Sequence, residues 1–311
     1  MKTIKVGGQL IELIKLCYYA DRPLLLIGRH GAGKSEILAQ AATQLGVEYI
    51  CRDLSLMEPP DLIGLPKMDG MATRYLPPAF LPVEGKGLLV FEELNRCAPY
   101  MRAPCLQLLT ARCLNDYRLP QGWLPCAAIN PPDDDADYDV QDLDAALLSR
   151  FTRVAVIAHR EEWLSWARAK QLHPDVLGYV ASDPKIFEDT NPRSWKYVSD
   201  LLFAATDKQS VGKDILEAAI AGEIGNNRAV AFGDFRRRSS RHLTPPDAAE
   251  LLRRYGHHQQ QVRAWRTAGR LDVLGIVANS VQLLLQPGDN YEAIRSDRKQ
   301  WQALSRSSKV F

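Results

Sequence analysis

The sequence predicts an α/β protein, in which a parallel five-stranded sheet is sandwiched by helices and followed by an all-helical lid domain. In the first half of the chain, short apolar runs alternate with helical stretches, a pattern typical of a parallel sheet covered on both faces. After Val156 the apolar runs stop, and only helical spacing of apolar residues continues. The 311 residues are enough for two domains, and we place these at residues 1–158 and 159–311.

Five apolar runs are the expected strands of the sheet. They are Pro23–Gly28, Val47–Asp53, Gly87–Phe91, Leu124–Ile129 and Val154–Val156. A glycine-rich turn and a helix ending near Gly46 follow the first of them. We expect the stretch from about Glu58 to Lys86, which is rich in proline and glycine, to be irregular. A hairpin is expected at Asp116–Trp123, with its turn at Pro120–Gly122.

The second half of the chain contains five stretches with helical spacing of apolar residues. They are Trp163–Leu177, Ser194–Thr206, Gly212–Ala221, Asp247–Tyr255 and Leu271–Leu285. The stretch Arg236–Arg241, with two prolines shortly after it, is expected to be a loop.

Composition excludes several classes of protein. A content of 46% hydrophobic residues excludes a disordered chain. The sequence contains no apolar run of the roughly 18–20 residues that a membrane-spanning helix needs, and its start lacks the apolar core of a signal peptide, so we expect a cytoplasmic protein. Six cysteines in a chain this long are too few for a disulfide framework.

The net charge of +2 hides an asymmetry along the chain. Residues 1–150 contain 15 basic and 19 acidic residues, a net charge of −4. Residues 151–311 contain 24 basic and 18 acidic residues, a net charge of +6. Opposite charges on the two halves would complement each other between neighbouring subunits.

A phosphate-binding motif follows the first expected strand. The stretch matches G-x-x-x-x-G-K-[ST] with Gly28, Arg29, His30, Gly31, Ala32, Gly33, Lys34 and Ser35. Glycines allow main-chain N–H groups to surround phosphates at a helix N-terminus, whose dipole favours anions. Lys34 would reach the β- and γ-phosphates of a nucleotide, and Ser35 would offer its hydroxyl to Mg²⁺. The motif therefore predicts ATP binding.

Two carboxylates end the third expected strand, in the stretch Leu88–Glu93. They should lie beside the phosphate loop, because ligands of parallel sheets bind at the carboxyl edge. Glu92 would hold Mg²⁺ and Glu93 would polarise the attacking water. The carboxylate that holds Mg²⁺ at this position in P-loop NTPases is usually Asp. Glu92 is one methylene longer, so the sequence predicts ATP binding more firmly than ATP hydrolysis. The alternative is a strand that ends in two solvated acids.

Together these motifs resemble those of AAA+ ATPases, and further segments resemble the MoxR-like branch of that family. The matching segments are Arg52–Leu54, Pro60–Gly64, Glu92–Arg96, Asp144–Phe151 and Pro192–Ser194. The resemblance covers roughly residues 20–205, with a weaker continuation into the helical lid. It implies an ATP hydrolase that needs Mg²⁺.

The resemblance also assigns roles to residues outside the phosphate loop. Asn130 matches the sensor that orients the attacking water, and Arg193 matches the lid arginine that senses the γ-phosphate. Arg150 matches the arginine that reaches into a neighbouring subunit's nucleotide site, although the nearby Arg153 could share or take that role. An arginine acting between subunits implies an oligomer, usually a six-membered ring in this family.

The resemblance further implies a remodelling machine with a protein client, often paired with a von Willebrand factor A (vWA) domain on another chain. Within the insert Met68–Pro82, the candidate contacts to the client are Tyr75, Phe80 and Leu81.

Two other functions stay open. One is a nucleic-acid motor or clamp, with a basic lid formed by Arg253, Arg254, Arg263, Arg266 and Arg270. The other is an ATP-gated scaffold with little turnover, which the Glu92 substitution keeps possible.

Overall fold

The computed structural model describes residues 2–131, 143, 148–207 and 211–240, with a few single residues between 259 and 281. The chain divides into two compact units, Met1–Glu162 and Trp163–Phe311. This division falls four residues after the boundary that the sequence suggested. The expected helix at Asp247–Tyr255 lies outside the described residues, as does most of the one at Leu271–Leu285.

The first unit is built on a parallel sheet with the strand order β1-β10-β2-β9-β6-β3. Every pairing within it is parallel. The strands are β1 (Thr3–Lys5), β2 (Leu24–Ile27), β3 (Glu48–Asp53), β6 (Gly87–Glu92), β9 (Trp123–Ile129) and β10 (Thr152–Ile157). The expected α/β class is therefore confirmed, and all five expected strands are present.

The sheet has six strands rather than the expected five, because β1 adds to its edge. Thr3 pairs with Ala155 and Lys5 with Ile157 of β10. β1 has three residues, of which only Ile4 is apolar, so it contains no apolar run that a sequence pattern could detect.

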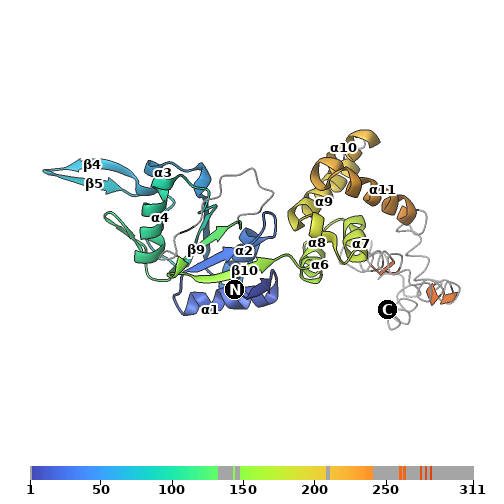
Figure 1. Cartoon of the computed structure of the whole chain (residues 1–311), viewed down its shortest axis with the longest axis horizontal. Coiled ribbons are helices and arrows are strands. Elements are labelled where there is room, and N and C mark those ends of the chain that lie inside the picture. Colours follow the sequence, from blue (N-terminus) through green and yellow to red (C-terminus); the bar gives the residue numbers. More distant parts are fainter. Residues whose placement is uncertain are drawn as a thin grey trace, which may run out of the picture. The chain divides into compact units, whose positions relative to one another are not determined.

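Helices cover both faces of the sheet (Figure 1). They are α1 (Gly8–Tyr19), α2 (Lys34–Leu45), α3 (Pro59–Ile63) and α4 (Pro99–Ala111). Leu24 and Leu26 pack with α1 and α2 in one apolar cluster, whereas Leu25 packs with α3 and α4 in another. Alternate residues of a strand face opposite sides of a sheet, so three consecutive leucines are fully buried.

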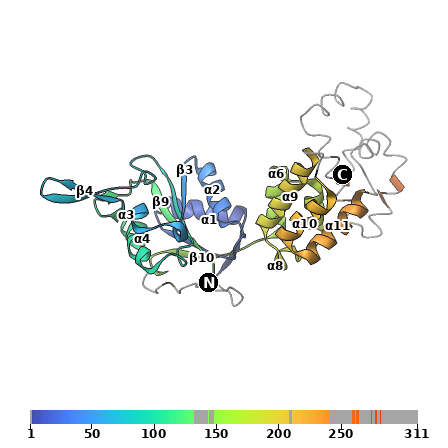
Figure 2. The same cartoon turned by 90° about the horizontal axis from the view of Figure 1, so that it is seen from above.

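The stretch that we expected to be irregular contains an antiparallel hairpin of β4 (Leu65–Asp69) and β5 (Ala72–Leu76). Both views show it extending away from the sheet (Figures 1 and 2). Nearly all of its residues are exposed, so neither face has the alternation of apolar and polar residues that identifies a strand.

The apolar surface of this hairpin is not the one that the sequence suggested. Leu81 is buried, and Phe80 lies under the guanidinium of Arg52 at 4.7 Å, so both serve local packing. Tyr75, the third candidate, lies on β5 and is half-buried. The exposed apolar side chains lie beside it on the hairpin. They belong to Leu65, Met68, Met71 and Leu76.

The second hairpin also differs from its prediction. Its strands are β7 (Cys113–Leu114) and β8 (Tyr117–Arg118), which place the turn at Asn115 and Asp116. Asn115 adopts a left-handed φ of 52°, which asparagine tolerates better than most residues. The expected turn at Pro120–Gly122 is a separate one that leads into β9, where the Trp123 N–H donates to the Pro120 carbonyl.

Helices make up the described part of the second unit (Figure 2). They are α6 (Arg160–Ala169, which begins in the first unit), α7 (Pro174–Ser182), α8 (Ile186–Asp189), α9 (Pro192–Asp207), α10 (Lys213–Ile224) and α11 (Asn226–Ser240). Its core contains an aromatic cluster in which the Tyr179, Trp195 and Phe232 rings lie 5.3–5.6 Å apart.

Two expectations for this unit are wrong. The single helix expected at Trp163–Leu177 is divided into α6 and α7, because Pro174 cannot continue a helix and instead begins a new one. The loop expected from Arg236 onward is helical to Ser240. Ion pairs of Arg236 with Asp175 and of Arg237 with Asp234 offset the basic charge there.

Candidate nucleotide site

The phosphate loop joins β2 to α2 at the carboxyl edge of the sheet. Gly31 and Gly33 have φ values of 71° and 98°, a region that favours glycine. A Cβ on Gly28 would lie 2.6 Å from the main-chain oxygen of Val156 on β10. The loop's backbone therefore needs glycine for conformation at two positions and for close approach at a third.

Lys34, the first residue of α2, directs its ammonium group back into the loop. Nζ donates to the main-chain oxygens of Gly28 at 2.6 Å and Arg29 at 3.1 Å. It also donates to the side-chain Oδ1 of Asn130 at 2.6 Å. The lysine of the motif is thus linked directly to Asn130, the residue that follows β9.

Ser35 and Glu92 meet beside the loop, as expected of residues that share a metal ion. The Ser35 hydroxyl donates to Glu92 Oε1, so the longer carboxylate reaches the start of α2. The Tyr49 hydroxyl donates to the Ser35 main-chain oxygen at 3.2 Å. Burial and the negative charge of Glu92 raise the pKa of Cys51 to about 11, which keeps that thiol protonated at neutral pH.

Sequence reasoning missed Tyr49 and Cys51. Both lie on β3 beside the strand that carries Glu92, and Cys51 pairs with Val90 in the sheet. Their positions follow from strand order alone, which no local motif encodes.

Glu93 and Asn130 form the centre of the site. The Asn130 amide nitrogen donates to Glu93 Oε1 at 2.8 Å and to Oε2 at 3.0 Å. The Glu93 side chain is only 15% exposed, and Arg96 Nη1 lies 3.4 Å from its Oε2. The Glu93 backbone has a φ of 55°, a left-handed value that is uncommon for a residue with a side chain. Strained backbone of this kind clusters at active sites in other proteins, so Glu93 is a candidate functional residue.

Asn95, which lies inside the matching segment Glu92–Arg96 and had no predicted role, contacts the same group. It is 2% exposed, and its Nδ2 donates to the Asn130 main-chain oxygen at 2.7 Å. No sequence signal identifies this role, because the burial of Asn95 is visible only in the folded chain.

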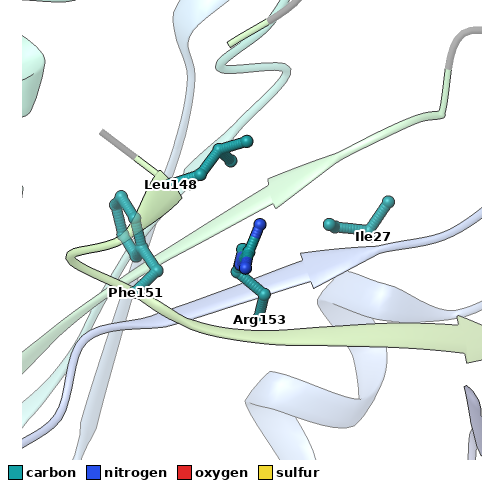
Figure 3. A pocket seen from close by; sticks show the side chains of 4 residues that line it. All are labelled: Ile27, Leu148, Phe151 and Arg153. Carbon is teal, nitrogen blue, oxygen red and sulfur yellow. The ribbon is translucent and has the colours of Figure 1, made fainter. Parts of the chain in front are cut away.

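The three candidate arginines lie elsewhere. Arg150 is exposed and donates to the Thr110 hydroxyl on α4 at 3.3 Å. Arg153 lines a cavity of about 510 Å³ together with Ile27, Leu148 and Phe151, and Figure 3 shows its side chain between those of Phe151 and Ile27. Arg193 is an exposed residue at the start of α9 in the second unit. Their catalytic roles remain predictions.

Other kinds of site have no support within the described residues. No group of three or more His, Cys, Asp or Glu side chains there could hold a metal ion. Among the same residues, no helix has both the length and the apolar character needed to cross a membrane.

The sheet, the glycine-rich loop and the loop lysine at the carboxyl edge define a P-loop α/β unit. No family model and no curated protein matches the sequence.

Several solved structures are similar in part. A candidate ATPase from Cytophaga hutchinsonii is 20% identical, and the match covers 69% of this chain and 68% of that one. NtrX from Brucella abortus in complex with ADP is 13% identical, with coverage of 73% and 64%. A mutant of RuvB from Thermotoga maritima is 15% identical, with coverage of 70% and 72%. All three TM-scores are 0.42, so the site rests on its own geometry.

Proposed function

We propose that the first unit binds ATP with Mg²⁺ and hydrolyses the β–γ phosphoanhydride bond, as a MoxR-like AAA+ ATPase. The observation that carries this proposal is the hydrogen-bonded series from Lys34 through Asn130 to Glu93. It joins a phosphate-binding cation, an orienting amide and a carboxylate base. These are three of the parts that the protein supplies for phosphoryl transfer to water.

The residues of the loop fit a nucleoside triphosphate. The left-handed backbone of Gly31 and Gly33 shapes the turn, and the approach of Gly28 to Val156 holds the loop close against β10. Ser35 and Glu92 would hold Mg²⁺ through oxygen atoms, the ligands that this ion prefers. When bound, Mg²⁺ supplies positive charge that neutralises the phosphate oxygens.

In this proposal Glu93 accepts a proton from the attacking water, and the Asn130 amide orients that water relative to the carboxylate. Lys34 offsets negative charge on the β- and γ-phosphates. Since Asn130 bonds to both other side chains, the base and the cation keep a fixed relation to one another.

The proposal extends to an oligomer. Arg150, or Arg153 in its place, would reach a neighbouring subunit's nucleotide from a six-membered ring, and Arg193 would sense the γ-phosphate from the lid. The exposure of Arg150 is compatible with this role. Hydrolysis would then remodel a protein client, with a vWA-domain chain as adaptor. Exposed apolar residues on the β4–β5 hairpin, such as Met68 and Met71, support contact with a client protein.

The structure bears on the two alternatives. The bond from Ser35 to Glu92 favours turnover over a passive scaffold, because the extra methylene of Glu92 does not remove it from the proposed metal position. The basic lid residues behind the nucleic-acid alternative lie outside the described part of the chain, except Arg263.

Binding of a fluorescent ATP analogue and phosphate release, measured with and without Mg²⁺, test this function. We expect turnover by the wild type, loss of binding in Lys34→Ala, and binding without turnover in Glu93→Gln. A wild type that binds ATP but never releases phosphate would support the scaffold instead. Stimulation by DNA, and not by protein fractions, would support the nucleic-acid function.

A further inference from the structure

Asn95 connects the turn after β6 to the end of β9. Its side chain is 2% exposed, and its Nδ2 donates to the main-chain oxygen of Asn130 at 2.7 Å. A side-chain amide is a short link, and burial restricts its rotamers. The two segments are thereby held at a fixed separation at the point where the Asn130 and Glu93 side chains meet.

The hydrogen bond from Asn95 to Asn130 lies just beyond the last paired residues of β2, β6 and β9. The last pair between β6 and β9 is Glu92 with Ala128, and the last pair between β2 and β9 is Ile27 with Ile129. Glu93 and Asn130 both follow those pairs, so ladder hydrogen bonds no longer fix them. Pro131, the residue after Asn130, has no N–H with which to continue a ladder.

The turn that carries Asn95 is itself well ordered. The N–H groups of Arg96 and Cys97 both donate to the Glu93 main-chain oxygen, at 2.8 and 3.1 Å. This closed turn fixes the left-handed backbone of Glu93 and directs Asn95 toward β9. The turn therefore connects the Glu93 carboxylate to the hydrogen bond between Asn95 and Asn130.

Burial of Asn95 carries a cost that packing alone does not explain. Its Oδ1 is buried and has no hydrogen-bond partner among the described residues. An unsatisfied buried polar atom destabilises the folded chain, whereas an apolar side chain of similar size, such as leucine, would avoid that cost. Retaining an amide here is understandable if the single bond to Asn130 is needed.

We propose that Asn95 is a positioning residue for ATP hydrolysis: by holding the main chain of Asn130, it places that residue's amide between Lys34 and Glu93. The inference rests on the proposed function, since it presupposes turnover. Asn95 does not touch Lys34 or Glu93 through any bond described above and acts only through Asn130.

The kinetic test compares Asn95→Leu and Asn95→Ala with wild type. A loss of alignment of about 1 Å can cost about 100-fold in rate, so we expect kcat to fall roughly 10- to 100-fold. We expect KM for ATP to change less than about threefold, because the phosphate loop is unaltered. An equal loss of kcat in both variants would point to the missing hydrogen bond, because leucine and alanine differ in how they fill the site.

Two further variants isolate the link. Cys105→Ala changes a fully buried residue of the same apolar cluster that lies outside the turn, and it should retain kcat within about threefold. Adding Asn95→Leu to Asn130→Ala should cause no further loss of kcat, because the amide to be positioned is already absent. Additive losses, or an equal loss in Cys105→Ala, would overturn the inference.

A readout independent of turnover uses asparagine-selective ¹⁵N labelling. In wild type, the Asn130 side-chain amide protons should resonate downfield of free asparagine because they bond to Glu93. In Asn95→Leu they should move toward the free position while the thermal midpoint stays within a few degrees. Unchanged resonances together with normal kcat would overturn the inference and leave the proposed function intact. A wild type without turnover would overturn both.

Discussion

The Asn130 amide donates to both carboxylate oxygens of Glu93, at 2.8 and 3.0 Å, while its own oxygen accepts from Lys34 at 2.6 Å. These contacts use the full polarity of one amide, because its nitrogen only donates and its oxygen only accepts. Three side chains that are far apart in sequence therefore form one unit. A substitution of any one of them should therefore alter the position of the other two side chains.

Replacing the carboxylate of Glu93 tests its role as base. Glu93→Gln keeps an oxygen that can accept from Asn130 but loses the negative charge, so we expect turnover to fall by about 10²- to 10⁴-fold. Affinity for ATP should stay within a few fold. Phosphate release and equilibrium binding measure the two effects, and the exposed Glu12→Gln on α1 is the control. Full turnover in Glu93→Gln would remove Glu93 as the base.

The hydroxyl of Ser35 should matter mainly through Mg²⁺. Ser35→Ala removes the group that donates to Glu92, and we expect the Mg²⁺ concentration for half-maximal turnover to rise about tenfold or more. Thr43→Ala, which alters a hydroxyl near the other end of α2, should leave that concentration unchanged. An unaltered Mg²⁺ titration in Ser35→Ala would argue that Ser35 does not hold the ion.

A mixing experiment tests the arginine that acts between subunits. We expect Arg150→Glu to bind ATP normally but to lose about 10³-fold in turnover. Mixed with Glu93→Gln subunits, it should regain turnover, because some interfaces then combine an intact Glu93 with an intact Arg150. Arg153→Glu, tested in parallel, decides between the two arginines. Normal turnover in Arg150→Glu alone would exclude it.

The close approach at Gly28 predicts a stability effect. A methyl group there meets the main-chain oxygen of Val156 at 2.6 Å, and backbone yields less readily than a side chain. We expect Gly28→Ala to destabilise the first unit by about 1–3 kcal/mol. Gly8→Ala is the matched control, since the added methyl group meets nothing within 4 Å apart from its chain neighbours and the backbone of its own helix. Urea unfolding of both variants measures the difference, and equal midpoints would contradict the prediction.

His173 predicts a pH dependence of stability in the second unit. Its Nδ1 accepts the Asp175 N–H at 3.2 Å at the start of α7. Burial lowers the His173 pKa; Asp175 opposes this shift and Arg236 adds to it. The unfolded chain, with a histidine pKa near 6.5, therefore binds the proton more readily than the folded chain. Stability from this group is present above about pH 6.5 and is lost as the pH falls below that value.

His173→Asn keeps a side-chain acceptor for the helix start but does not titrate in this range. We expect its thermal midpoint to decline less than that of wild type between pH 7 and pH 5. His159→Asn controls for the loss of a histidine elsewhere in the described chain. Parallel declines in wild type and His173→Asn would show that another group is responsible.

The sequence allowed prediction of the features that depend on local pattern. Apolar runs such as Leu24–Ile27 identify buried strands, and the spacing from Gly28 to Ser35 identifies the phosphate loop. The nearness of Glu93 to the loop followed from a general property of parallel sheets. The roles of Arg150 and Arg193, which came from a resemblance, stay predictions.

Features that depend on distant partners were not predictable. Strand β1 is only three residues long and exists through its pairing with β10. The β4–β5 hairpin buries neither face, so it carries no alternating pattern. Asn95 is a polar residue, which a sequence pattern places at the surface, yet it is buried in the structure. Its bond to Asn130 depends on strand order, which brings together residues 35 positions apart.

The neighbours of β2 have a consequence for synthesis on the ribosome. β2 lies between β9 and β10, whose residues emerge about 100 and 130 positions after it. At about 5–20 residues per second, β2 waits roughly 5–25 s before both neighbours exist. β1 must wait longer still, since the strand that it pairs with among the described residues is β10. A nascent chain halted before Thr152 should therefore be unable to retain nucleotide, although it already contains the whole phosphate loop, Glu93 and Asn130.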